Sequence, residues 1–123
     1  MLSTTDDLRI CELKELSTPQ DVMREIPRTL TATRIVMAAR NAIHAILNGT
    51  DDRLLVVVGP CSVHDPVAAV EYAERLAALR EQLADRLEIV MRVYFEKPRT
   101  TVGWKGLIND PDMDDSFHIE KGI

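Results

Sequence analysis

The sequence predicts an α/β fold in which two parallel strands are joined by a helix and preceded by an N-terminal helical stretch. The continuous apolar run 54–58 predicts a strand that is covered on both faces. Residues 87–95 predict a second strand, in which Arg92 interrupts an apolar stretch. Between them, apolar side chains recur at helical spacing from Tyr72 to Leu83. A strand, a helix and a strand within about forty residues form a βαβ unit, which requires the two strands to be parallel.

The N-terminal part predicts an arm followed by helices. Residues 1–18 are polar with scattered apolar positions, so we expect an arm that packs on another surface. Pro19 and Pro27 bracket a short helical segment. Residues 30–47 predict a longer helix, because apolar side chains recur every three or four positions, and the following Asn-Gly pair ends it.

The helix between the strands has a clear start signal. Asp65 predicts an N-cap, and Pro66 suits the first helical position because the N–H that it lacks would be unpaired there. From residue 96 onward the chain is expected to be loop. We therefore divide the chain into an N-terminal arm and helical extension, 1–50, and a βαβ portion, 51–123. Two strands leave both sheet edges unpaired, so the βαβ portion alone is expected to be an incomplete fold.

Composition restricts the class of protein. The 123 residues are 46% hydrophobic and carry a net charge of -5, so neither a nucleic acid nor an anionic membrane is expected as a partner. Cys11 and Cys61 have no paired spacing, and both are expected to be thiols in a reducing compartment. The sequence shows no signal-peptide pattern and no apolar run near the ~18 residues of a membrane span, so a cytoplasmic location is predicted.

The first candidate site follows the first strand. In parallel α/β folds, functional groups gather where strands end at the carboxyl edge of the sheet. Cys61 lies in this position with His64 three residues later, and the two are candidate metal ligands. The alternative is a small buried thiol beside a histidine that makes loop hydrogen bonds, which is the more common arrangement for an isolated Cys-x-x-His pair.

The second candidate site follows the second strand. Arg92, Lys97 and Arg99 place three cations within eight residues, and Thr100 adds a hydroxyl. Pro98 stiffens this loop because its ring fixes the backbone. Such a group suits phosphate or carboxylate, since arginine binds in a bidentate manner and lysine supplies a point charge. The alternative is an arginine paired with a structural carboxylate, followed by a solvated basic loop.

Two long motifs carry a family resemblance. Residues 54–66, Leu-Leu-Val-Val-Val-Gly-Pro-Cys-Ser-Val-His-Asp-Pro, and residues 89–111, which run from Ile-Val-Met-Arg-Val-Tyr-Phe-Glu-Lys-Pro-Arg-Thr to Leu-Ile-Asn-Asp-Pro, resemble the N-terminal signatures of the type I 3-deoxy-D-arabino-heptulosonate-7-phosphate (DAHP) synthases. The resemblance covers essentially the whole chain and is closest to the phenylalanine-regulated branch. It implies the N-terminal extension and first two strands of a (β/α)₈ TIM barrel.

The resemblance also implies a reaction and roles for residues. The family condenses phosphoenolpyruvate with erythrose 4-phosphate and releases phosphate, the first step of the shikimate pathway. By resemblance, Cys61 is a ligand of a divalent metal such as manganese, iron or cobalt, with His64 beside it. Arg92 and Lys97 match groups that face phosphoenolpyruvate. The loop that cradles erythrose 4-phosphate is matched by Pro98, Arg99 and Thr100. A homo-oligomer with feedback by an aromatic amino acid is implied as well.

A barrel of this kind takes about 250 residues, so the 123 residues are expected to form only part of one. The family's other metal ligands would come from later strands. We therefore expect the chain to be inactive alone. The alternative is a non-catalytic fragment that docks on intact synthase subunits and affects their assembly or feedback control.

Overall fold

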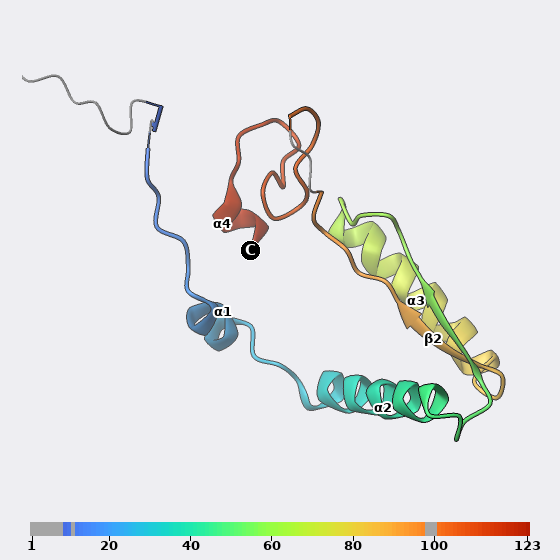
Figure 1. The fold of residues 1–123 in the computed structure, drawn as a ribbon. Helices are drawn as coiled ribbons and strands as arrows, with labels where there is room; N and C mark the ends of the chain where they lie inside the picture. Colours follow the sequence, from blue (N-terminus) through green and yellow to red (C-terminus); the bar gives the residue numbers. More distant parts are fainter. Residues whose placement is uncertain (1–8, 11, 98–100) are drawn as a thin grey trace, which may run out of the picture.

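The computed structural model describes residues 9–10, 12–97 and 101–123. Four helices and two strands follow one another along these residues (Figure 1). They are α1 (Pro19–Glu25), α2 (Leu30–Leu47), β1 (Leu54–Val58), α3 (Pro66–Gln82), β2 (Leu87–Met91) and α4 (Ile119–Gly122).

Helices α1, α2 and α3 begin where the sequence predicts. Thr18 and Thr29 cap α1 and α2, and each threonine side chain accepts a hydrogen bond from a backbone N–H of the first turn. Asp65 caps α3, because its carboxylate accepts from the N–H groups of Val67 at 2.8 Å and Ala68 at 3.3 Å. The bounds of α2 coincide with the predicted helix, and Gly49 follows it with a positive φ of 73°.

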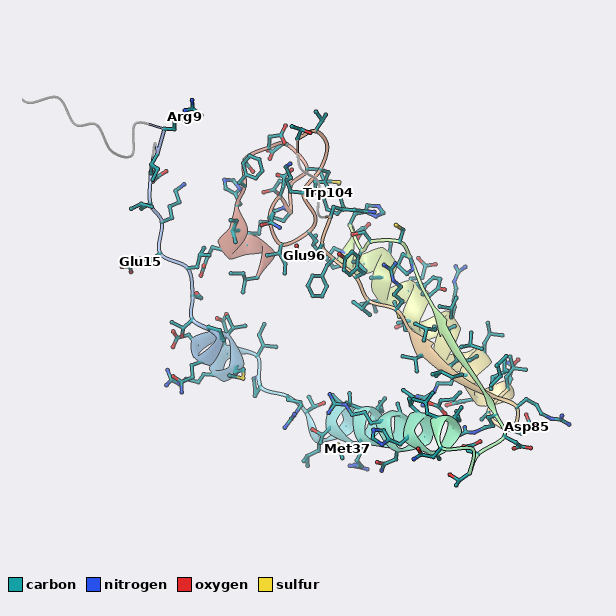
Figure 2. The ribbon with its side chains drawn as sticks, viewed as in Figure 1. Arg9, Glu15, Met37, Asp85, Glu96 and Trp104 are labelled. Carbon is teal, nitrogen blue, oxygen red and sulfur yellow. The ribbon has the colours of Figure 1, made fainter. Side chains whose placement is uncertain are left out.

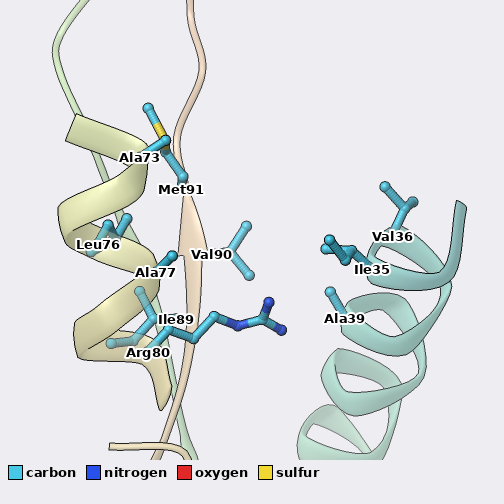
Figure 3. A pocket seen from close by; sticks show the side chains of 10 residues that line it. All are labelled: Ile35, Val36, Ala39, Ala73, Leu76, Ala77, Arg80, Ile89, Val90 and Met91. Carbon is cyan, nitrogen blue, oxygen red and sulfur yellow. The ribbon is translucent and has the colours of Figure 1, made fainter. Parts of the chain in front are cut away.

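The two strands are parallel, which confirms the predicted βαβ unit. The register runs from Leu54 opposite Leu87 to Val58 opposite Met91. Helix α3 lies along the strand pair, and α2 approaches β2 from another side (Figures 1 and 3). In Figure 3 the side chain of Ile89 points toward α3, whereas that of Val90 points toward α2. β2 therefore carries apolar side chains on both faces, as expected for a strand of a parallel sheet, although Glu88 adds one buried charge.

The second strand is shorter than predicted. It ends at Met91 rather than at residue 95, because β1 ends at Val58 and offers no further regular partner. The N–H of Arg92 still donates to the carbonyl of Val58 at 2.8 Å, and the chain then continues as an irregular extended segment. The prediction of loop from residue 96 onward was also incomplete. Glu96 forms an isolated antiparallel bridge with Gly106, and α4 lies near the end of the chain.

Little of the described chain is buried. Val63 and Ile89 are its buried hydrophobic residues, and Glu88 and Asp110 are its buried charged ones. Large apolar side chains on both strands and on the helices stay exposed, among them Leu54 at 65% and Val57 at 61%. The described residues include no helix that is both long enough and apolar enough to cross a membrane. The βαβ portion thus exposes apolar surface that other elements would normally cover.

Candidate functional site

The loops that leave the two strands run beside each other at the carboxyl end of the sheet. The N–H of Val63 donates to the carbonyl of Tyr94 at 2.6 Å, and the hydroxyl of Ser62 lies 3.4 Å from the carbonyl of Glu96. Val63 is 6% exposed, so this contact anchors the loop after β1 against the segment after β2. The described residues of the two candidate sites predicted from the sequence are consequently brought together.

Gly59 makes this close approach possible. A Cβ atom at position 59 would lie 2.3 Å from the backbone carbonyl oxygen of Arg92, closer than any side chain tolerates. The clash would be with backbone, which has no rotamer to relieve it. The glycine at the end of β1 is therefore required by the distance between the two chain segments, and it places Cys61 next to the second loop.

Arg92 ties the two loops together through its side chain. Its Nη1 donates to the carbonyl of Pro60 at 2.9 Å and to that of Cys61 at 2.8 Å. The guanidinium carbon also lies 4.9 Å from the centroid of the Tyr94 ring, which is within the range of a cation–π contact. The guanidinium is thereby held over the loop that carries Cys61, although the residue as a whole is exposed.

Lys97 contacts the cysteine itself. Its Nζ lies 3.1 Å from Cys61 Sγ, and this hydrogen bond, followed by the charge of Lys97, lowers the pKa of the Cys61 thiol below its ordinary value. Burial opposes the shift, and Arg92 adds a smaller effect in the same direction as Lys97. Cys61 is an exposed free cysteine. The arrangement therefore favours an accessible thiolate, which is the form that binds metal ions.

A further loop supports the backbone of Lys97. The N–H of Lys97 donates to the carbonyl of Lys105 at 3.2 Å, and the N–H of Leu107 donates to the carbonyl of Phe95 at 2.8 Å. Gly106 permits this contact, because its φ is +108° and a Cβ there would lie 2.7 Å from the carbonyl oxygen of Phe95. The loop thus fixes the backbone that carries Lys97.

This loop is braced from within by groups that sequence reasoning missed. Asp110 is 1% exposed, and its main-chain carbonyl accepts from Trp104 Nε1 at 2.6 Å. Its side-chain Oδ2 accepts from the N–H of Asp115 at 3.3 Å. No periodicity marks Asp110 as buried. Strand alternation places Tyr94 on the same face as Arg92, but the contact between its ring and the guanidinium was not predicted.

The remaining candidates divide into two groups. Pro98, Arg99 and Thr100 lie outside the described residues. His64 is exposed, and within the described residues no hydrogen bond joins it to Cys61. It borders a cavity of 190 Å³ beside the start of α3. Across residues 9–10, 12–97 and 101–123, no group of three His, Cys, Asp or Glu side chains is placed to hold a metal ion.

Comparison with known proteins identifies the family. The family model described as "DAHP synthetase I family" matches residues 25–123. The chain is 69% identical over 118 residues to the Phe-sensitive phospho-2-dehydro-3-deoxyheptonate aldolase of Escherichia coli K12, which covers 96% of this chain and 34% of the relative. It is 57% identical over 122 residues to the Trp-sensitive aldolase of Enterobacter agglomerans, covering 99% of this chain and 35% of the relative.

A solved structure agrees with these matches. The phospho-2-dehydro-3-deoxyheptonate aldolase of Francisella tularensis SCHU S4 superposes with a TM-score of 0.87 at 50% sequence identity, covering 92% of this chain and 33% of that one. The chain therefore spans about a third of the length of the relatives that it matches. Because the family model matches most of its residues, the chain belongs to the DAHP synthetase I family.

Proposed function

We propose that this chain supplies part of the active centre of a DAHP synthase, which joins phosphoenolpyruvate and erythrose 4-phosphate, takes up water and releases phosphate. The observation that carries the proposal is the meeting of Cys61, Arg92 and Lys97 at the carboxyl end of the two strands. A soft metal ligand and two anion-binding cations lie there within one small region. Carbon–carbon bond formation between two phosphorylated substrates can use both kinds of group, because the cations hold the anions and a metal ion would polarise the aldehyde.

We assign phosphoenolpyruvate to the two cations. The guanidinium of Arg92 has five N–H donors, and the bonds to the carbonyls of Pro60 and Cys61 both use Nη1. Its other donors are the groups that we assign to the phosphate or carboxylate of the substrate. Lys97 adds a second positive charge at the same place. Together they neutralise a multiply charged anion and orient its enol carbon toward the aldehyde.

Cys61 fits the role of a metal ligand. Its thiol is exposed, and its pKa is lowered chiefly by the hydrogen bond from Lys97, so the sulfur is disposed to bind as thiolate. A divalent manganese, iron or cobalt ion would act there as a Lewis acid toward the aldehyde oxygen. One ligand does not hold such an ion, and the described residues offer no group of three ligands, so we assign the others to the part of a family protein that this chain does not match.

The second substrate is assigned to the loop that follows Lys97. Pro98, Arg99 and Thr100 continue directly from the anion site, and an arginine with a hydroxyl suits the phosphate of erythrose 4-phosphate. The names of two relatives describe them as Phe-sensitive and Trp-sensitive. We extend feedback by an aromatic amino acid, and assembly as a homo-oligomer, to the complete protein of which this chain would form part.

The proposal is tested by restoring the missing part. The chain is joined to the remaining two-thirds of the Escherichia coli Phe-sensitive relative, and formation of DAHP and phosphate is measured with manganese ion. We expect the restored protein to be active and the chain alone to be inactive. Cys61→Ala should remove both activity and bound metal, whereas Cys11→Ala, which removes the other thiol, should keep both. Full activity and metal content in Cys61→Ala would contradict the assignment.

A further inference from the structure

The segment 94–97 is held from two sides. On one side, carbonyl groups of the segment accept hydrogen bonds from the loop after β1. On the other side, Glu96 forms an antiparallel bridge with Gly106 of the loop 104–110. Figure 2 labels Glu96 on the segment and Trp104 on this loop. The position of the last residue of the segment, the lysine of the proposed anion site, therefore depends on both neighbours.

The side chain of Trp104 closes the loop 104–110 on itself. Its Nε1 donates to the main-chain carbonyl of Asp110 at 2.6 Å, across a separation of six positions. Asp110 is 1% exposed and Trp104 is half-buried, so the bond is shielded from water, where a hydrogen bond is electrostatically stronger. The indole thus joins the two ends of the loop, and Gly106 between them faces the segment 94–97.

The closed loop reaches Lys97 through the backbone. The N–H of Lys97 donates to the carbonyl of Lys105 at 3.2 Å, which is at the long end of the normal range. Lys105 directly follows Trp104, so a shift of the indole moves the carbonyl that accepts from Lys97. The other end of the lysine, Nζ, lies 3.1 Å from Cys61 Sγ, at the place that we assign to phosphoenolpyruvate.

We propose that Trp104 is a positioning residue, which acts through Lys97 on the binding of phosphoenolpyruvate. The indole fixes the loop, and the loop fixes the backbone that carries the ammonium group. A displaced ammonium group would lose its alignment with the bound anion, and small displacements are costly in a site that depends on orientation. The inference rests on the proposed function for the identity of the anion.

Two other roles for Trp104 lead to different results. In a purely structural role, Trp104 would change stability, and any effect of its replacement on kinetics would not depend on Lys97. As an aromatic surface that contacts a ligand directly, Trp104 would also act independently of Lys97. An indole has a single N–H donor, and here the carbonyl of Asp110 already uses it. The dependence of the Trp104 effect on Lys97 is therefore the deciding measurement.

The test is a double-mutant cycle in the restored protein, in which this chain is joined to the remaining two-thirds of the Escherichia coli Phe-sensitive relative. Trp104→Phe keeps an aromatic ring and removes the N–H donor. It should raise KM for phosphoenolpyruvate by about tenfold and change kcat by less than about threefold. In the Lys97→Ala background, the same substitution should change kcat/KM by less than about twofold. Equal effects in the two backgrounds would overturn the proposal.

Thr29→Ala is the matched control. It also removes one hydrogen bond, from the N–H of Ala32 to Thr29 Oγ1 at 3.1 Å, but at the start of α2. It should change KM by less than about twofold in both backgrounds, although it lowers stability as well. Urea denaturation measures the stability of each variant. An equal rise of KM in Thr29→Ala would show that lost stability, and not the loop, explains the effect.

Amide hydrogen exchange separates this inference from the proposed function. In the full chain, Trp104→Phe should speed exchange of the segment 94–97 by about fivefold or more, and Thr29→Ala should leave it unchanged, as read by mass spectrometry. An inactive restored protein would reject the proposed function, and this exchange rate would then decide whether Trp104 holds the segment. Unchanged exchange in Trp104→Phe would overturn the inference, whatever the activity.

Discussion

Arginines lie at both ends of the strand pair, but they pair with carboxylates at the amino end and with carbonyls at the carboxyl end. At the amino end, Arg53 Nη1 lies 2.9 Å from Glu88 and Arg80 Nη2 lies 2.8 Å from the other oxygen of the same carboxylate. Arg53 also pairs with Asp51 and thereby lowers the pKa of that carboxyl group. The side chain of Glu88 is 6% exposed, so the shared carboxylate is nearly removed from water.

At the carboxyl end, the cations have no such counter-charge among the described residues. Arg92 bonds to two carbonyls and lies over the Tyr94 ring, and Lys97 bonds to the thiol of Cys61. The positive charge of an arginine that is paired with a carboxylate is already neutralised, and the pair stabilises the fold. The charge of a cation that contacts only carbonyls or a thiol is not neutralised, so it can still bind an anionic ligand. On our proposal, the amino end of the sheet therefore serves the structure and its carboxyl end serves binding.

The largest expected effect is on catalysis at the carboxyl end. In the restored protein, Arg92→Ala and Lys97→Ala should each lower kcat/KM by about 30- to 1000-fold, which is about 2 to 4 kcal/mol, because a bound anion loses a charge-assisted hydrogen bond. Steady-state kinetics with phosphoenolpyruvate measure the change. The free energy of unfolding should fall by less than about 1 kcal/mol. A large loss of stability with normal kinetics would reverse the contrast between the two ends.

The next effect is on stability at the amino end. Glu88→Gln in the restored protein leaves two arginines without their shared carboxylate and should lower the free energy of unfolding by about 2 to 3 kcal/mol, measured by urea denaturation. This value is set below the usual cost of breaking a buried pair, because the arginine side chains are 22% and 36% exposed. Glu71→Gln, which breaks an exposed pair with Arg75, is the control and should cost about 0.5 kcal/mol or less.

A smaller effect concerns the thiol of Cys61. In the chain with Cys11 replaced by serine, the rate of alkylation by iodoacetamide should rise at lower pH than for an ordinary thiol, because Lys97 lowers the pKa of Cys61. Lys97→Met should move the rate profile to higher pH and slow the reaction at neutral pH, while rates well above the thiol pKa converge. Lys121→Met, which removes a lysine paired with Asp112, should leave the profile unchanged. An identical profile for Lys97→Met would show that the contact does not form in solution.

The smallest effect is expected at His64. In the restored protein, His64→Ala should lower kcat/KM by less than about threefold and leave the metal content unchanged, since no hydrogen bond joins it to Cys61 within the described residues. Metal analysis beside kinetics provides the measurement. If His64→Ala lost as much metal as Cys61→Ala, the two residues would both be metal ligands. The binding site at the carboxyl end would then include His64.

Local pattern was enough to place most elements. The cap at Asp65 and the apolar run at 54–58 specify a helix start and a strand through short-range chemistry, and the structure places both where they were predicted. The extent of β2 was not predictable in this way. Its apolar run continues to Phe95, but a strand exists only where a partner pairs with it, and β1 stops at Val58.

The sequence by itself determined the family, the parallel strand pair and the expectation that Cys61, Arg92 and Lys97 gather at one edge, because the carboxyl ends of parallel strands lie together. Only the tertiary structure decided which atoms meet. The contact of Lys97 with the thiol and the bonds of Arg92 to the loop carbonyls depend on how close Gly59 lets the chain approach. In the sequence, Glu88 is one polar residue in a largely apolar strand. Its partners Arg53 and Arg80 lie 35 and 8 residues away along the chain. Such pairing between distant positions leaves no local signal, because the energy of an ion pair depends on distance in space.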